Sequence, residues 1–248
     1  MAGRSATGGY DPSGIDLHEW EILESQLEES IPNYDRVNRL MTFGQDSVWR
    51  KNVRNHAKAG MKVLEVGCGP GSFAEDIENV DLTCLDPSEE MLKVARKRVE
   101  AARKSRGEGP AEYVQAIAES IPLPDNTFDR VFCLFSFRDF QDKEKGLQEI
   151  LRVLKPGGQL VICDAGKANW LHGLAGRIWM STVVQLMARY VTKKKDHPWK
   201  GLAKTYSHYG TNGYYRKLLR NVGFERVQGR LLMPFGMSSR FRGWKPKN

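Results

Sequence analysis

The sequence has few cysteines, and their spacing excludes the usual paired arrangements. Four are present among 248 residues, far apart and without a C-x-x-C motif: Cys68, Cys84, Cys133 and Cys163. This distribution favours reduced, packed cysteines in a cytoplasmic protein over disulfides or metal ligands. No cluster of histidine, cysteine and acidic residues has the spacing of a metal site, so we predict no metal.

Long hydrophobic runs are also missing. No stretch of about 18 apolar residues is free of charge, so we expect no membrane-spanning helix. The first fourteen residues lack the apolar core of a secretory signal and have too little arginine for a typical mitochondrial transit peptide. They are rich in glycine and serine, and we expect a disordered tail at residues 1–14. The length of the chain suits one α/β domain with additions.

The two ends of the chain differ in charge: basic residues are scarce near the N-terminus, and acidic residues are scarce near the C-terminus. Residues 1–35 hold eight acidic residues against one basic residue, whereas residues 193–248 hold fourteen basic residues against two acidic ones. A basic C-terminal region is compatible with nucleic acid, an anionic membrane surface or an acidic substrate as partner. A basic face that only contacts solvent is an equally good interpretation.

Residues 15–60 show helical rather than strand periodicity. In residues 16–30, apolar residues recur at every third or fourth position with glutamates between them, which predicts an amphipathic helix. Two further helices are expected in residues 33–60, separated at Gly44. We therefore expect an N-terminal helical cap at residues 15–60.

From residue 61 onward, strand and helix patterns alternate. The expected strands are residues 61–66, 80–85, 111–117, 128–135 and 159–164, and the expected helices are residues 71–79, 88–104 and 142–154. This alternation is typical of an α/β fold with a mostly parallel, doubly wound sheet.

A long helical pattern at residues 168–191 then interrupts the alternation. It contains two tryptophans but is too polar to span a membrane. A helix at residues 211–221 and an apolar hairpin at residues 224–237 follow. We expect residues 61–248 to form one domain with a helical insertion at about residues 168–210.

A glycine-rich turn follows the first of these strands, in the segment VLEVGCGPG at residues 63–71. Because glycine has no Cβ, the backbone at Gly67, Gly69 and Gly71 can pass close to a ligand. The spacing differs from the dinucleotide motif G-x-G-x-x-G, and the absence of G-K-S/T excludes a Walker loop. Asp86 ends the second strand, where an acid can bind a ribose diol. Together, turn and acid predict an adenosine-containing ligand.

The same segments resemble class I S-adenosylmethionine-dependent methyltransferases. VLEVGCGPG, LDPSEEML and FDRVFCLFSFRDFQDKEKGLQEILRVLKPGG carry this likeness. More narrowly, the blocks at residues 34–50, 136–158 and 231–245 are similar to the UbiE-type ubiquinone/menaquinone-biosynthesis C-methyltransferases. The resemblance runs from about residue 33 to the end, and the first block is its most specific part. It implies a Rossmann-like, seven-stranded, mostly parallel sheet with helices on both faces.

The resemblance implies S-adenosylmethionine as the cofactor, with S-adenosylhomocysteine as its product. The residues that it places around the cofactor are Tyr34, Asn38, Glu65, Gly67, Cys68, Gly69, Gly71, Asp86, Pro87, Met91, Ile117, Ala118, Glu119 and Leu134. The family's acid that would meet the adenine amino group is Ile117 here. Adenine recognition is therefore expected to use backbone groups and apolar packing.

The acceptor implied by the resemblance is a polyprenylated quinone precursor or a similar lipophilic phenol, methylated on a ring carbon. Arg138 matches the family's arginine, but Asp139 stands where the family has asparagine. C-methylation requires a proton to leave, so Asp139 is a candidate base or hydroxyl-orienting acid; a structural ion pair with Arg138 is the alternative. His208 and Tyr209 are the next candidates.

The expected helix at residues 168–191 would lie over the C-terminal edge of the sheet. Its aromatic and methionine side chains suit an isoprenoid tail, although a plain core helix explains them equally well. With the lysines at residues 193–195, this region is also compatible with peripheral contact to an anionic bilayer.

Three rival functions remain open. One is methylation of a phospholipid amine or a small natural product. Another is an RNA or protein methyltransferase, although FSFRDF stands where an N/D-P-P-Y/F motif would be, so a nucleic-acid partner is not favoured. The last is a non-catalytic cofactor-binding scaffold. The sequence makes no prediction of oligomeric state.

Overall fold

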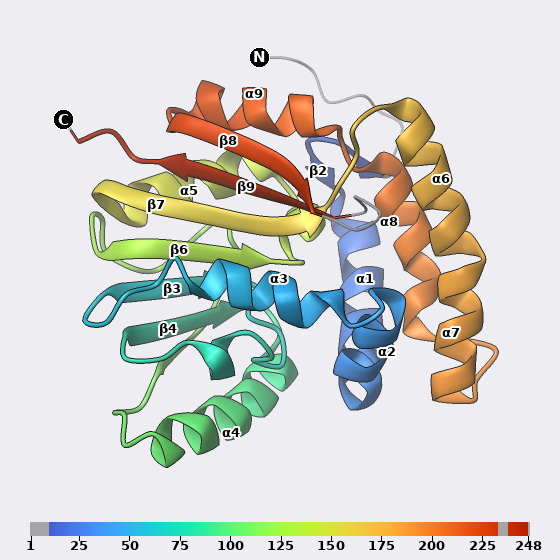
Figure 1. The fold of residues 1–248 in the computed structure, drawn as a ribbon, viewed down its shortest axis with the longest axis horizontal. Helices are drawn as coiled ribbons and strands as arrows, with labels where there is room; N and C mark the ends of the chain where they lie inside the picture. Colours follow the sequence, from blue (N-terminus) through green and yellow to red (C-terminus); the bar gives the residue numbers. More distant parts are fainter. Residues whose placement is uncertain (1–9, 233–237, 248) are drawn as a thin grey trace.

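The protein is built on one seven-stranded sheet, as the computed structural model shows for residues 10–232 and 238–247 (Figure 1). Its strand order is β5-β4-β3-β6-β7-β9-β8. The strands are β3 (Lys62–Val66), β4 (Asp81–Asp86), β5 (Glu112–Gln115), β6 (Phe128–Leu134), β7 (Leu154–Ala165), β8 (Glu225–Leu232) and β9 (Ser238–Trp244). β3 to β7 pair in parallel, and β9 is antiparallel to both β7 and β8. The predicted mostly parallel, seven-stranded fold is confirmed.

Helices cover both faces of the sheet and its C-terminal edge. They are α1 (Leu17–Ser30), α2 (Tyr34–Met41), α3 (Gln45–Arg54), α4 (Glu89–Ser105), α5 (Lys143–Val153), α6 (Trp170–Ser181), α7 (Val183–Thr192), α8 (Leu202–His208) and α9 (Asn212–Val222), with short 3-10 turns η1 (Ile31–Asn33), η2 (Ala74–Asp76), η3 (Phe137–Asp139) and η4 (Pro198–Gly201). Alternate residues of a strand point to opposite faces. Accordingly, Leu64 packs in the core with α5 and α9, and its neighbour Val63 packs in the core with α3 and α4.

A separate layer of helices lies across the C-terminal edge of the sheet. In Figure 1, α1, α2, α6, α7 and α8 lie beyond the strand ends, and α6 and α7 are the outermost elements of this layer. α8 packs against α6, and α2 packs against α7. Segments from the start of the chain and from the insertion therefore meet where the βα turns open.

The long helix expected at residues 168–191 is two helices, so this prediction is wrong. The break falls at Thr182, whose backbone has φ −119° and ψ −75°. Its hydroxyl donates a hydrogen bond to Ile178 O at 2.6 Å. A threonine hydroxyl competes for the helix's own carbonyls, and two β-branched valines follow it, which weakens the continuous helix.

The helix expected at residues 71–79 reduces to the turn η2. Arginines from distant helices bind carbonyls that a helix would use internally. Arg50 donates to Ser72 O at 2.8 Å, Arg54 to Asp76 O at 3.1 Å and Arg106 to Glu75 O at 3.0 Å. The local pattern gave no sign of these long-range donors, which explains the error.

The segment before α1 is partly ordered. Residues 10–15 form a small hairpin of β1 (Tyr10–Asp11) and β2 (Gly14–Ile15). The N–H of Ile15 donates to Gln141 O at 3.1 Å, and the Tyr215 hydroxyl donates to Pro12 O at 3.1 Å. The expected disordered tail is therefore wrong for residues 10–14; its other residues lie outside the described part of the chain.

The terminal hairpin also differs from expectation. Its second strand, β9, starts after the predicted range of 224–237, whose last five residues lie outside the described part. Among residues 10–232 and 238–247, no helix is long and apolar enough to cross a membrane.

Gly71 offers a test of how tightly the glycine turn packs on α4. Its φ is +79°, and a Cβ there would lie 3.0 Å from the Ala95 Cα. Gly107 has a similar φ of +72°, but a Cβ there would have no neighbour within 4 Å. We expect Gly107→Ala to lower the free energy of unfolding by about 1–2 kcal/mol through backbone strain alone. Gly71→Ala should lose roughly 1–3 kcal/mol more through overpacking. Urea unfolding of both variants measures the difference, and equal losses would contradict the packing role.

Candidate active site

The glycine turn between β3 and η2 lies directly against the neighbouring strands. Gly67 and Gly69 have φ values of +69° and +53°, which favour glycine. The N–H of Gly67 donates to Leu85 O at 2.7 Å, and a Cβ at Gly67 would lie 2.5 Å from the Ser136 Oγ. Any side chain at this position would displace the loop after β6. The turn thus forms a closely fitted floor for a cleft at the sheet's edge.

Asp86 holds this floor in place from the end of β4. Its carboxylate accepts hydrogen bonds from Gly69 N–H at 2.7 Å and Ser88 N–H at 3.1 Å. Burial raises the pKa of Asp86 to about 6, although these two hydrogen bonds oppose the rise. Each carboxylate oxygen has a further lone pair, so Asp86 can also accept from a hydroxyl-bearing ligand.

A recess of about 270 Å³, including its open mouth, lies beside the turn and is lined by one acidic and one basic side chain. Burial raises the pKa of Glu65 well above its usual range, and among the described residues its Oε2 has no hydrogen-bond partner. The Arg50 guanidinium lines the same recess and donates to Ser72 O. A buried acid and a buried cation in one small recess match the ammonium and carboxylate of an amino acid.

The other end of the cleft is walled by α1. This part has a volume of about 540 Å³ including its open mouth, and Trp20, Glu24 and Leu27 of α1 face Asp86 and Ile117 across it. Burial, followed by the neighbouring acids, raises the pKa of Glu24. No hydrogen bond or ion pair joins the Glu24 carboxylate to any residue of the described ranges. It is therefore an available acceptor opposite Ile117.

One polar contact ties α1 to the sheet. The Ser88 hydroxyl caps α4 by accepting from Met91 N–H at 3.1 Å and donates to Glu28 Oε1 at 2.6 Å. A side-chain cap of this kind satisfies an otherwise unpaired N–H of the first helical turn. The same serine thus fixes both the start of α4 and the position of α1 above Asp86.

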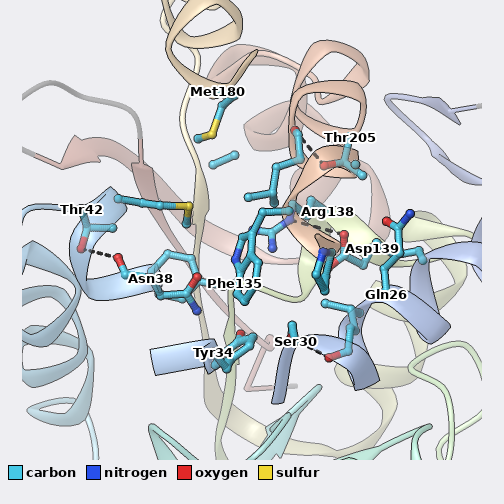
Figure 2. Close-up of a pocket in the computed structure, with 18 of the residues that line it drawn as sticks. Gln26, Ser30, Tyr34, Asn38, Thr42, Phe135, Arg138, Asp139, Met180 and Thr205 are labelled. Carbon is cyan, nitrogen blue, oxygen red and sulfur yellow. Dashed lines mark hydrogen bonds and ion pairs between the residues drawn. The ribbon is translucent and has the colours of Figure 1, made fainter. Parts of the chain in front are cut away.

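A second, larger cavity adjoins this cleft and encloses about 900 Å³ including its open mouth. Its walls come from α1, α2, α6, η4 and α8. Leu23, Leu27, Tyr34, Phe135 and Asp139 line both spaces, so the two cavities share a boundary. Figure 2 shows Tyr34 and Met180 on opposite sides of this cavity, with Phe135, Arg138 and Asp139 between them.

The shared boundary contains a buried ionic group. Asp164, wholly buried at the end of β7, accepts from Arg138 N–H at 2.9 Å and from its guanidinium at 3.2 Å. Asp139 Oδ1 lies 3.4 Å from Arg138 Nε and makes no hydrogen bond within the described ranges. Burial raises the pKa of Asp139 to about 6, opposed by Arg138. Burial acts to lower the pKa of Arg138, but Asp139 and Asp164 outweigh it and raise that pKa. Asp139 thus lines both cavities and keeps an oxygen without a hydrogen bond among the described residues.

Most residues predicted around the cofactor line the cleft or its recess. These are Tyr34, Glu65, Gly67, Cys68, Gly69, Asp86, Pro87, Met91, Ile117, Ala118, Glu119 and Leu134. Asn38 lines only the larger cavity, because the turns of α2 carry it away from the sheet. Gly71 packs against α4 instead of facing the cleft. Glu119 already accepts from Asp142 N–H at 2.9 Å through Oε1.

His208 and Tyr209 are not brought into either cavity. His208 is exposed at the end of α8 and contacts the Ser207 hydroxyl at 3.1 Å. Tyr209 is buried in the core, with its ring 4.5 Å from that of Tyr215. Neither side chain lines the cleft or the larger cavity. Within the described residues, no group of three or more potential metal ligands occurs.

The sequence analysis did not assign several of the lining residues, among them Trp20, Glu24 and Arg50. The amphipathic pattern of residues 16–30 predicted the helix but not what it would face. Arg50 lies within a segment that resembled a known family, and its burial beside Glu65 is what distinguishes it from the exposed basic residues around it. Only long-range packing places these side chains at the sheet edge.

Comparison with known proteins agrees with this geometry. Residues 21–245 match the model of the ubiE/COQ5 methyltransferase family. The chain is 30% identical over 217 residues to the ubiquinone/menaquinone biosynthesis C-methyltransferase UbiE of Shewanella halifaxensis, covering 84% of each protein. It is 31% identical over 241 residues to that of Pseudomonas fluorescens, covering 91% of this chain and 92% of the relative.

The fold also has solved counterparts. A crystal structure from Thermotoga maritima, described as an S-adenosylmethionine-dependent methyltransferase and possible histamine N-methyltransferase, superposes with a TM-score of 0.62 at 22% identity. The match covers 92% of this chain and all of that one. The family model matches nearly the whole chain, and the residues that line the cleft at the sheet edge fit a methyl-donor site. The protein is therefore an S-adenosylmethionine-dependent methyltransferase that belongs to the ubiE/COQ5 methyltransferase family.

Proposed function

We propose that this enzyme methylates a ring carbon of a lipophilic hydroxyaromatic acceptor, such as a polyprenylated quinone precursor. The observation that carries the proposal is the apolar cavity of about 900 Å³ that meets the cofactor cleft at Asp139 and Arg138. Leu23, Leu27 and Met180 supply apolar walls for a ring and the start of a tail. The relatives' names agree with such an acceptor.

The bound cofactor supplies an electrophilic methyl group. Asp139 accepts the proton of the acceptor hydroxyl, which raises the electron density of the ring carbon. The Arg138 guanidinium stabilises the resulting oxyanion. The new carbon–carbon bond forms as the S–CH3 bond of the cofactor breaks, which leaves S-adenosylhomocysteine. The ring carbon then loses its proton to solvent, and the oxygen takes back the proton held by Asp139, so that the hydroxyaromatic ring is restored. Tyr34 and Phe135 separate the two cavities and exclude water from the reacting atoms.

The cofactor is held from both ends of the cleft in this proposal. Glu65 binds the ammonium and Arg50 the carboxylate of its amino-acid part. Asp86 accepts from the ribose, and Pro87 and Met91 pack against the adenine. Glu24 of α1 takes the place of the missing acid at Ile117. Because the acceptor is lipophilic, we also propose that the enzyme works peripherally at an anionic membrane surface.

The acceptor is identified by incubating the protein with methyl-labelled cofactor and a total lipid extract. Label in a lipid-soluble, ring-containing product is the expected result. Label in a phospholipid headgroup or a water-soluble amine would instead identify an N-methyltransferase. Salt-sensitive RNA binding with labelled RNA would favour a nucleic-acid substrate. Cofactor binding without labelled product in any fraction would indicate a scaffold.

Glu65→Gln tests recognition of the amino-acid end. We expect the affinity for S-adenosylhomocysteine to fall roughly tenfold to a hundredfold, because a charge-assisted contact to the ammonium is lost. 5′-Methylthioadenosine has no amino-acid group, so its affinity should not change. Calorimetric titration of both ligands separates the two effects. Equal losses for both would indicate a distorted cleft and not a lost ammonium contact.

Glu24→Gln tests whether α1 replaces the missing acid. The variant should bind S-adenosylhomocysteine about tenfold more weakly, since a neutral amide is a poorer acceptor for the donors of adenosine. Adding Ile117→Asp should restore much of the affinity by returning an acid to the opposite wall. Glu21→Gln, on the exposed side of the same helix, is the matched control. Unchanged binding in Glu24→Gln would remove Glu24 from the site.

Asp139→Asn tests the base. With the acceptor in hand, kcat/KM should fall as the pH drops below about 6, because protonated Asp139 cannot accept a proton. The variant should lose this dependence and reduce kcat by about a hundredfold or more. Its affinity for S-adenosylhomocysteine should stay close to that of the parent protein. Full turnover in the variant would show that Asp139 is not the base.

A further inference from the structure

α6 has two faces of different character. Its inner face is buried: Gly176 packs against Tyr206 of α8, and Met180 lines the acceptor cavity. Its outer face carries large apolar side chains at positions i, i+1, i+4 and i+8. These are Trp170, Leu171, Leu174 and Ile178, exposed by 72%, 58%, 39% and 54%. A helix covered only on its inner side has no internal reason to keep four such side chains in water.

α7 extends this apolar surface. Leu186 and Tyr190 lie one turn apart and are exposed by 65% and 67%. With the four of α6, they account for half of the twelve most exposed large apolar side chains in the described chain. We call these six side chains the α6–α7 outer face. Their concentration on two adjacent helices distinguishes them from the single apolar residues scattered over ordinary surfaces.

The charge that α6, α7 and the lysines after α7 contribute to this face is positive. Residues 166–195 contain six lysines and arginines and no acidic residue. Lys167 is engaged inside, donating to Tyr209 O at 2.6 Å. The other five, Arg177, Arg189 and Lys193 to Lys195, are exposed. Lys194 pairs with Glu29 of α1 at 3.2 Å, whereas no ion pair within the described ranges involves the other four. An apolar stripe bordered mainly by cations is complementary to a surface that is apolar within and anionic at its rim.

A strained aromatic residue lies at the edge of the same layer. Phe43 joins α2 to α3 with φ +50°, a left-handed conformation that an aromatic residue rarely adopts. Its ring is about half exposed and lies 5.5 Å from that of Trp179 on α6. Aromatic side chains are favoured where an apolar region meets water.

We propose that the α6–α7 outer face docks on an anionic lipid bilayer, so that α6 lies between the membrane and the acceptor cavity. The apolar side chains enter the headgroup–acyl boundary, and the five exposed cations pair with anionic headgroups. This inference rests on the proposed lipophilic acceptor, which would then reach the cavity from the bilayer past the helix whose inner face supplies Met180. No described helix could cross the membrane, so the contact is peripheral.

The test is flotation of the full chain with phosphatidylcholine vesicles that contain or lack phosphatidylglycerol. The parent protein should bind the anionic vesicles and not the neutral ones. Two variants each remove one component of the face. One is Trp170→Ser with Leu171→Ser and Ile178→Ser, and the other is Arg189→Gln with Lys193→Gln and Lys195→Gln, which leaves the Lys194–Glu29 pair intact. Each should reduce binding by about tenfold or more.

Matched controls change equal numbers of similar side chains elsewhere. Leu17→Ser, Ile22→Ser and Val48→Ser remove exposed apolar residues of α1 and α3. Lys58→Gln, Lys97→Gln and Lys104→Gln remove the same net charge outside the face. Both controls should bind like the parent protein. The proposal would be overturned if the face variants bound anionic vesicles like the parent protein, or if the control variants lost binding to the same extent. Self-association that the apolar variant abolishes would assign the face to a second copy of the chain.

Activity separates this inference from the proposed function. On a water-soluble, short-chain acceptor, the face variants should turn over like the parent, whereas on vesicle-embedded acceptor they should be slower by about the loss in binding. If the protein binds vesicles through this face but methylates no hydroxyaromatic lipid, the proposed docking site is supported and the proposed acceptor is contradicted. If the protein methylates such a lipid but does not bind vesicles, the proposed acceptor is supported and the proposed docking site is contradicted.

Discussion

The arrangement of the acceptor side depends on one buried carboxylate, that of Asp164. It ends β7 without exposure to solvent and accepts from the N–H and the guanidinium of Arg138. A buried charge is tolerated only when it is paired and hydrogen-bonded. Asp164 therefore fixes Arg138 and with it the turn η3. This turn positions Asp139 at the boundary of the two cavities, where it keeps an oxygen without a hydrogen bond among the described residues. Of the two acids beside Arg138, Asp164 is therefore the one with its hydrogen bonds satisfied, and Asp139 is the one left able to accept from a ligand.

The site has a rigid half and a half supplied by distant helices. The rigid half is the glycine turn with Asp86, held by hydrogen bonds between neighbouring strands. The other half is α1, attached through the Ser88–Glu28 contact. Because Leu23 and Leu27 wall both cavities, any shift of α1 changes the cofactor cleft and the acceptor cavity together.

The insertion contributes α6, whose inner and outer faces have different surroundings. Its inner face is fixed by the close approach of Gly176 to Tyr206, which a larger side chain would prevent. Its outer face retains apolar and cationic side chains that the rest of the described chain does not cover. The break at Thr182 lets α7 change direction and pack against α2.

Local sequence pattern was sufficient to predict the parallel strands β3 to β7 and the glycine turn and acid at their C-terminal edge, but not the antiparallel strand β9. Gly67, Gly69 and Asp86 lie in short strand–turn segments, and the ends of parallel strands meet at one edge, so local pattern was sufficient. The other features of the site and its surroundings depend on the tertiary packing of distant segments. It brought Glu24 and Arg50 to the cleft, left His208 in solvent, and replaced an expected helix by η2 through arginines from distant helices. These outcomes depend on contacts between residues far apart in the chain, and periodicity reports only which side of an element is apolar, not which element will cover it.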